Sequence, residues 1–545
     1  MSSGRYHPLS IILSCCFFSV ITLLLLEPHC CDGSKVLLVR PGEEGDDDHY
    51  ALLKLINRTG FPPDFTFGVG SSAYQYEGAA NQHGRRPSIW DTFTKLHPDK
   101  IADHSSGTTA EEFYYLYRED IGLLKEIGWD FFRFSISWPR LVPYGKVSRG
   151  VNQQGINFYN NLINELLAHG IQPFVTIVQW DLPQALEDEY GGFLSRDIVG
   201  DFRDYADLCF KEFGDRVKYW ATLNEPHNLA LYGYTLGIFA PGRCSYYMGN
   251  CSAGNSATEP YIVVHNQLLS HASAVQLYKS KYQASQKGKI GLTTESYWMK
   301  PKFQTDQSRK ATLRALDFHL GWILDPITFG HYPKSMRHLV GTRLPNFTAA
   351  ESEILRGSYD YLGINYYTAR YVDESTSYGT TDLSYTTDCR CNLTMERDGI
   401  PIGEPTAVEW LYIYPKGIRE LMHYVKNKYN PSVIYISENG MADINNSTIP
   451  LKDALRDTSR IKYHMLHLFY LSKAIEEGVN VKGYLVWSFL DDFEWALGYT
   501  IRFGLTFIDY ENGLKRYLKD SSFWFKQFLH SENTTHMVPL LQVSE

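Results

Sequence analysis

The stretch Tyr219–Pro226, YWATLNEP, decides how the rest of the chain is interpreted. It opens with aromatic, apolar and β-branched residues, which fit a pleated strand, and it ends in the polar residues Asn224 and Glu225. A continuous run of this kind is typical of a strand buried on both faces, as in a parallel sheet. Polar residues at its carboxyl end then mark the edge at which such a sheet opens toward a ligand.

Seven other runs share this pattern and alternate with helical segments. The eight runs are Phe65–Ser72, Phe131–Ser137, Pro173–Asp181, Tyr219–Pro226, Lys289–Ser296, Tyr361–Tyr367, Val433–Gly440 and Val481–Phe489. Amphipathic segments follow several of them, for example Asn157–His169 and Ile198–Phe213. Eight strands alternating with helices predict an α/β fold, a single (β/α)8 TIM barrel with long βα loops.

The composition narrows the function classes. The 545 residues are 44% hydrophobic and carry a formal net charge of −9. Nucleic acids and anionic membranes both select basic surfaces, so we expect neither as a partner. The sequence also lacks a phosphate-cradling glycine loop and any HExxH or CxxC cluster. We therefore predict no cofactor and no bound metal.

The two ends of the chain are predicted to lie outside the barrel. Residues 1–32 have the layout of a cleaved secretory signal peptide, because Arg5 precedes the apolar run Leu9–Leu26 and small and polar residues follow. A signal anchor is the alternative, since the run is nearly long enough to span a bilayer. We predict a flexible lead-in over 33–58, the barrel domain over 59–530 and a loose tail over 531–545. The destination is the secretory pathway, with the extracellular space (apoplast) and the vacuole both open, and no membrane association follows once the signal is removed.

Secretion would place the cysteines in an oxidising compartment. Cys244 and Cys251 close a short loop, so we predict a disulfide between them. Cys389 and Cys391 are separated by one residue, so that a bridge between them would be strained. Cys209 is expected to be a buried thiol. Candidate glycosylation sites, of which only some are expected to carry glycans, are Asn57, Asn250, Asn346, Asn392, Asn445, Asn446 and Asn533.

Two carboxylates stand out at the predicted strand ends. Glu225 follows the fourth strand and Glu438 ends the seventh, and each lies beside an asparagine. Other strand ends carry amides, carboxylates and tryptophans, which suit a polyol ligand once a barrel brings them to one face. Glycoside hydrolysis needs one acid to protonate the leaving oxygen and a second carboxylate to attack the anomeric carbon or activate water. We expect Tyr367 to hold Glu438 ionised by a hydrogen bond, and burial to keep Glu225 protonated.

Several segments, taken in order, resemble glycoside hydrolase family 1. They are FTFGVGSSAYQYEG (65–78), TLNEP (222–226), ISENG (436–440), WSFLD (487–491) and FEW (493–495). The insertion APGRCS (240–245) is similar to the plant β-glucosidase branch of that family. The resemblance extends from about Phe61 to about Phe528, which is nearly the whole predicted mature chain.

This resemblance implies a (β/α)8 barrel and double-displacement hydrolysis with retention. By analogy, Glu225 is the acid/base and Glu438 is the nucleophile. Trp487 would form the stacking floor for the sugar, Phe503 would line its pocket and Trp410 would stack on the aglycone. The remaining residues implied to bind the sugar are Gln75, Gln179, Asn224, Tyr367, Glu494 and Trp495.

One residue departs from the family pattern. The third-strand motif of the family usually reads His-Trp-Asp, and here it begins with Gln179. A glutamine amide still donates a hydrogen bond but cannot become charged, so we expect sugar binding to survive with an altered sugar preference or pH profile. Members that cleave thioglucosides typically carry glutamine at the acid/base position, so Glu225 favours O-glycosides.

The leading hypothesis is a retaining β-glucosidase whose partner is a small glycoside with an apolar or aromatic aglycone. One alternative keeps the mechanism but changes the sugar to a β-fucoside, a β-galactoside or a disaccharide glycoside. The other is a catalytically weak relative that binds sugars. Homo-oligomerisation stays open, as does the natural aglycone.

Overall fold

The computed structural model describes residues 56–375 and 381–530, and its centre is a closed barrel of eight parallel strands. Seven of the eight predicted runs contain one of these strands, and the run Pro173–Asp181 overlaps a strand that begins one residue earlier, at Gln172, so the predicted TIM barrel is confirmed. Around the barrel the strands follow the order β1-β16-β14-β7-β5-β4-β3-β2. Their bounds are β1 Thr66–Gly70, β2 Phe131–Ser135, β3 Gln172–Val178, β4 Tyr219–Asn224, β5 Lys289–Glu295, β7 Tyr361–Asn365, β14 Ile434–Asn439 and β16 Val481–Val486.

Aromatic side chains fill the interior of the barrel. Six buried residues, one from each of six strands, pack together there: Phe131, Phe174, Ala221, Tyr361, Tyr435 and Leu485. The rings of Phe174 on β3 and Tyr435 on β14 lie 5.8 Å apart. These two strands are not neighbours in the barrel, so the contact crosses the interior. The barrel is thus a packed core that supports the strand ends above it.

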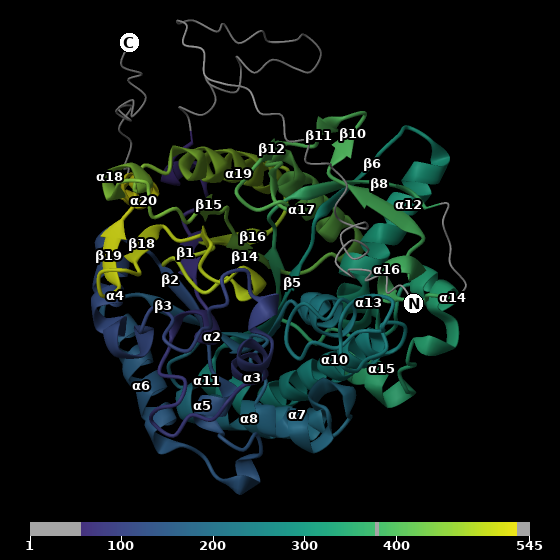
Figure 1. Ribbon diagram of the computed structural model, residues 1–545, viewed down its shortest axis with the longest axis horizontal. Helices are drawn as coiled ribbons and strands as arrows, with labels where there is room; N and C mark the ends of the chain where they lie inside the picture. Colours follow the sequence, from purple (N-terminus) through teal and green to yellow (C-terminus); the bar gives the residue numbers. More distant parts are fainter. Residues whose placement is uncertain (1–55, 376–380, 531–545) are drawn as a thin grey trace, which may run out of the picture.

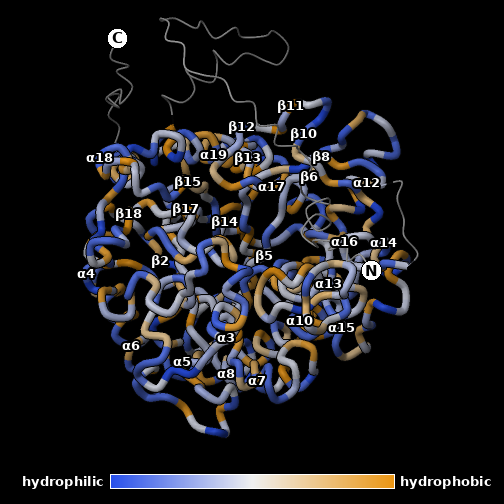
Figure 2. Tube along the Cα trace, in the orientation of Figure 1, coloured by the Kyte–Doolittle hydropathy of each residue, from blue (hydrophilic) through white to orange (hydrophobic). Residues whose placement is uncertain are grey.

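Helices surround the barrel (Figure 1). In α6, buried residues recur every three or four positions from Ile156 to Leu166, which is the apolar stripe of a helix packed on one side. Figure 2 shows hydrophilic and hydrophobic residues interspersed along these outer helices. The main ones are α4 Phe113–Ile127, α6 Gln153–Ala168, α8 Ile198–Phe213, α10 Glu259–Leu277, α13 Trp322–Phe329, α17 Lys416–Tyr429, α19 Thr458–Glu476 and α20 Asp520–His530.

Long loops follow several strands and carry small sheets of their own. The largest joins β6 (Trp298–Pro301), β8 (Ala369–Glu374) and β9 (Cys391–Thr394). Two-stranded sheets form between β15 (Asp443–Ile444) and β17 (Ile501–Arg502) and between β18 (Thr506–Asp509) and β19 (Lys515–Leu518). The prediction of long βα loops is therefore confirmed.

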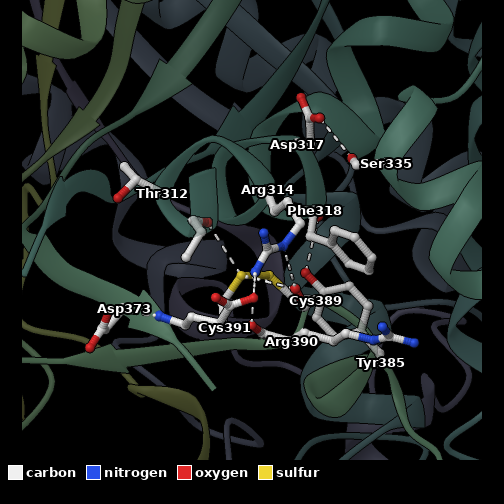
Figure 3. The surroundings of a disulfide bond; sticks show 12 residues. Thr312, Arg314, Asp317, Phe318, Ser335, Asp373, Tyr385, Cys389, Arg390 and Cys391 are labelled. Atoms are coloured by element: carbon white, nitrogen blue, oxygen red, sulfur yellow. Dashed lines mark hydrogen bonds and ion pairs between the residues drawn. A yellow bond between two sulfur atoms is a disulfide. The ribbon is translucent and has the colours of Figure 1, made fainter. Parts of the chain in front are cut away.

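Two disulfides are present in the described residues. Cys244 and Cys251 are bonded as predicted, and Cys209 is buried with a free thiol. Cys389 and Cys391 are bonded too, a pairing that the sequence left open. Between them Arg390 has a φ of 51°, and this left-handed turn brings the two Cα atoms to 5.2 Å. The guanidinium of Arg314 donates to the carbonyl oxygens of Cys389 and Arg390 and fixes the same turn (Figure 3).

The predicted signal peptide, most of the predicted lead-in, the tail and the sequon at Asn533 lie outside the described residues. Within 56–375 and 381–530, no helix combines the length and the apolar composition that a bilayer crossing requires.

Candidate active site

Glu438 lies near the end of β14 and receives two strong hydrogen bonds. The guanidinium Nη1 of Arg133 lies 2.5 Å from its Oε1, and the hydroxyl of Tyr367 donates to its Oε2 over 2.7 Å. All three side chains are buried. One donor is a cation and the other is a hydroxyl, so both oxygens of Glu438 are held by hydrogen bonds and one of these bonds is charge-assisted. The predicted Tyr367 contact is thus present in the structure, and Arg133 adds a cation that sequence reasoning did not find.

Glu225 follows β4 directly and has a different environment. Its backbone φ of 46° lies in the left-handed region, at the point where the chain turns from the strand into the short helix α9 (Pro226–Asn228). Asn365 Nδ2 donates to its Oε1 over 2.6 Å, and Asn228 Nδ2 donates to its Oε2 over 2.9 Å. Among the described residues, the side chains that donate to this carboxyl are these two neutral amides.

Burial is the largest influence on the acidity of Glu225. It raises the pKa of this carboxyl well above its ordinary range, and the charges of Glu438 and Glu295 act in the same direction. The amide hydrogen bonds from Asn365 and Asn228 oppose this rise in pKa. The expectation of a buried, protonated Glu225 therefore agrees with the site that the fold builds.

Arg133 connects the two carboxyl-bearing strands. Its Nη2 donates to Asn224 Oδ1 over 2.8 Å, while Nη1 holds Glu438. Asn365 completes the link, because Ser437 Oγ donates to its Oδ1 over 2.8 Å and its own amide reaches Glu225. The only sequence signal for Arg133 was one charged residue within the aromatic strand FFRFS of β2. A cation in such a strand needs a buried anionic partner.

Most of the predicted sugar-binding residues gather around this pair in two groups. Tyr367, Trp487 and Phe503 share one apolar cluster, and the partly buried Trp410 packs against it. The Trp410 and Tyr367 rings meet edge to face at 5.8 Å. In the second group, Gln75 Nε2 lies 3.4 Å from Glu494 Oε2, and the Trp495 ring lies 4.7 Å from that of Trp180.

Gln179, the residue that departs from the family pattern, is buried near the end of the third barrel strand. Among the described residues its amide oxygen has no hydrogen-bond partner. A buried amide oxygen without a partner is costly, so this atom is available to a ligand hydroxyl.

Three buried side chains also come together beside Glu225 with metal-ligand chemistry. The ligand atoms of His227, Glu295 and His319 all lie within 4.8 Å of one another. His319 Nε2 lies 2.7 Å from Glu295 Oε2, and both nitrogens of His227 have hydrogen-bond partners. Burial lowers the pKa of His319 to about 3 and raises that of Glu295 to about 8. Protein partners therefore already occupy most of the ligand atoms of this cluster.

The arrangement offers a carboxyl paired with a guanidinium, a second carboxyl whose pKa is raised by burial, and several aromatic side chains at one end of a barrel. These are the parts that acid-assisted nucleophilic displacement at an anomeric carbon requires. Comparison with known proteins agrees with the chemistry. The sequence model for Glycosyl hydrolase family 1 matches residues 57–534.

The chain belongs to glycosyl hydrolase family 1.

Similar proteins in this family include Beta-glucosidase 17 of Arabidopsis thaliana, 55% identical over 492 residues, which cover 90% of this chain and 95% of that protein. Furcatin hydrolase of Viburnum furcatum is 56% identical and covers 86% of each chain. Among solved structures, a rice β-glucosidase mutant in a covalent complex with Glc matches with a TM-score of 0.86 at 48% identity, covering 87% of this chain and 100% of that one. This family 1 member is a retaining β-glucosidase that hydrolyses O-glycosidic bonds through a covalent glycosyl-enzyme intermediate.

Proposed function

We propose that this enzyme hydrolyses small β-D-glucosides with apolar or aromatic aglycones, using Glu225 as the acid/base and Glu438 as the nucleophile. The observation that carries the proposal is the contrast between the two carboxyls. Glu438 is held by the Arg133 guanidinium and the Tyr367 hydroxyl, whereas Glu225 is buried beside like charges and contacts neutral amides. Opposite environments of this kind support a different role for each carboxyl.

In the first step, Glu438 attacks the anomeric carbon while Glu225 transfers its proton to the glycosidic oxygen. The bond to the aglycone breaks, the aglycone leaves as an alcohol, and the sugar is held as an ester on Glu438. In the second step, ionised Glu225 takes a proton from water, whose oxygen attacks the same carbon and releases Glu438. Two inversions leave the anomeric configuration unchanged.

Variants of the two glutamates test the assigned roles. Glu438→Ala is expected to abolish turnover and to be rescued by azide, giving the glycosyl azide of inverted configuration. Glu225→Ala should reduce the turnover of glucosides with poor leaving groups far more than that of activated aryl glucosides, since only the former need the proton. The surface variant Glu126→Ala serves as the control. Equal leaving-group dependence in the two active-site variants would contradict the assignment.

Gln179 keeps one alternative for the sugar open. Its unpartnered amide oxygen is an acceptor for a sugar hydroxyl, and it acts equally at every pH because an amide does not ionise. A panel of aryl β-glucosides, β-fucosides and β-galactosides, together with disaccharide glycosides, ranks the sugars by kcat/KM. We expect the glucoside to rank first. A higher kcat/KM for another sugar would move the proposal to that glycoside.

The partly exposed ring of Trp410 supports the proposal that the aglycone is apolar or aromatic. Aromatic rings prefer offset or edge-to-face partners, and Trp410 keeps part of its indole exposed beside Tyr367. A screen of natural glucosides with identification of the released aglycone tests this part. A preference for glucosides with sugar-alcohol aglycones over glucosides with aryl aglycones would contradict the proposed aglycone class.

We also propose that the chain enters the secretory pathway as a glycoprotein, bound for the extracellular space or the vacuole. Support comes from the two disulfides and from sequons at the exposed residues Asn250, Asn346, Asn392 and Asn446. Asn445 is a poorer acceptor, because its amide nitrogen donates to the Tyr499 carbonyl over 2.7 Å. Enzymatic deglycosylation followed by peptide mapping, with the N-terminal residue sequenced, tests both points.

A further inference from the structure

A chain of hydrogen bonds leads from the surroundings of the barrel to the carboxyl of Glu225. Asn228 Nδ2 donates to Glu225 Oε2 over 2.9 Å, and Asn228 Oδ1 lies 3.1 Å from His227 Nδ1. His227 Nε2 in turn lies 2.7 Å from the hydroxyl of Tyr385, on the short helix α16 (Tyr385–Asp388). Three side chains from two separate segments thus form one line that ends on the acid/base oxygen.

The chemistry of its members gives this line a direction. Burial lowers the pKa of His227 well below its ordinary value, so the ring is neutral and has one N–H donor. Its Nδ1 faces the amide oxygen of Asn228, which is an acceptor, so Nδ1 carries the hydrogen. Nε2 is then an acceptor for the Tyr385 hydroxyl at 2.7 Å, and this hydroxyl shares its single hydrogen with the Phe318 carbonyl at 3.0 Å (Figure 3).

We propose that Asn228 is a positioning residue for the acid/base carboxyl, and that His227 and Tyr385 fix the direction of its amide. The proposal rests on the role of Glu225 given above. With the His227 donor on Oδ1, the amide of Asn228 presents its N–H to Glu225. A flipped amide would place its NH2 group against the His227 N–H and its oxygen against Glu225 Oε2, and both contacts are unfavourable. Donors in such a line also polarise one another.

The need for this donor follows from the second step of the reaction. Glu225 must lose its proton to act as a base, yet burial and the surrounding groups favour the protonated form. The titratable groups that face it from the packed elements are Glu438 on β14, Glu295 on β5, Glu494 after β16 and Tyr367 after β7. None of these is a cation, and the nearby Arg133 is engaged by Glu438 and Asn224. Asn228 and Asn365 are therefore the groups that stabilise the ionised form by direct contact.

The first experiment measures the pH dependence of kcat/KM for Asn228→Leu with a poor-leaving-group glucoside. Loss of a donor to the ionised form raises the pKa of Glu225, so the basic limb is expected to move up by about one pH unit. Asn266→Leu removes a matched buried amide, which donates to the Phe193 carbonyl away from Glu225, and should leave the limb in place. If Asn228 had a merely structural role, Asn228→Leu would lower kcat/KM at every pH without shifting the profile. A basic limb of Asn228→Leu at the wild-type pH would therefore overturn the proposal.

The second experiment tests the line itself. His227→Phe is expected to move the basic limb in the same direction by less than Asn228→Leu, and Tyr385→Phe by less again. The double variant His227→Phe/Asn228→Leu should match Asn228→Leu, because His227 acts only through the amide. Additive shifts would show that His227 acts independently and would overturn this part. The wild-type basic limb must itself vanish in Glu225→Ala with an activated substrate; if it persists there, the assigned role of Glu225 fails instead.

Discussion

At the residue scale, two chemically identical carboxyl groups differ in the hydrogen-bond donors that contact them. Glu438 receives one charged donor and one hydroxyl, and Glu225 receives two amides. A charge-assisted bond is roughly twice as strong as one between neutral groups. In the proposed mechanism, this difference suits Glu438 to attack the anomeric carbon and Glu225 to give up a proton.

The importance of Arg133 leads to a prediction on both stability and rate. Arg133→Met leaves Glu438 buried without its cation, which is expected to reduce the free energy of unfolding by about 3–5 kcal/mol. Arg133→Lys keeps the charge but loses the fork that binds Glu438 and Asn224 together. It should fold like the wild type and lose about ten- to a hundredfold in kcat. Urea unfolding and steady-state kinetics measure the two effects, and a fully active Arg133→Met would contradict the prediction.

Sequence alone could single out Glu225 and Glu438 as candidates because each lies in a short, contiguous motif at the end of a strand. It missed Arg133 because that contact joins residues 305 positions apart, and the local pattern around Arg133 is only an aromatic strand. Asn228 was missed for a different reason. It lies three residues after Glu225, but only the left-handed turn at Glu225 brings its amide back onto the carboxyl.

At the scale of the elements, the strands were predictable because each is an apolar run that ends where the barrel opens. The small structures in the loops were not, since their stability depends on distant partners. The segment from α16 to β9 is an example: Asp388 pairs with Arg343, and β9 pairs with β8 in a separate sheet. Those contacts position Cys389 and Cys391 for a bond that their spacing alone did not favour.

The two disulfides should therefore differ in what their removal costs. A cross-link restricts the unfolded chain less when the closed loop is shorter. In the chain-entropy description, Cys389→Ser/Cys391→Ser is expected to lose about 1.6 kcal/mol and Cys244→Ser/Cys251→Ser about 2.5 kcal/mol. Apparent thermal midpoints of the two double variants, measured at the same scan rate, give the order of the two stability losses. A larger loss from the Cys389 and Cys391 pair would mean that this bridge, and not the surrounding ion pair and sheet, holds the segment.

At the scale of the whole molecule, buried titratable groups of two kinds act against each other. Burial lowers the pKa of His265 to about 4 and those of His271 and His467 to about 3. Burial also raises the pKa of Glu187 to about 7 and that of Asp492 to about 8. The unfolded chain would bind protons at the histidines below about pH 6.5 and release them from the carboxyls above about pH 4.

These opposite shifts predict how stability depends on pH. Between about pH 4 and 6.5 the histidines make stability rise with pH, because the unfolded state binds more protons there, while the buried carboxyls make it fall. Above about pH 6.5 the histidines no longer contribute, and the folded state still holds extra protons on the carboxyls. Stability therefore falls further until the pH passes their folded pKa values of about 7 and 8, by up to about 1.4 kcal/mol per pH unit for each proton. Glu187 on α7 (Gln184–Tyr190) is not one of the two proposed catalytic residues, so Glu187→Gln should flatten this decline without changing the pH profile of turnover. Urea midpoints measured between pH 6.5 and 8.5 test the argument, and a midpoint that rises over this range would show that the buried carboxyls are ionised in the folded enzyme.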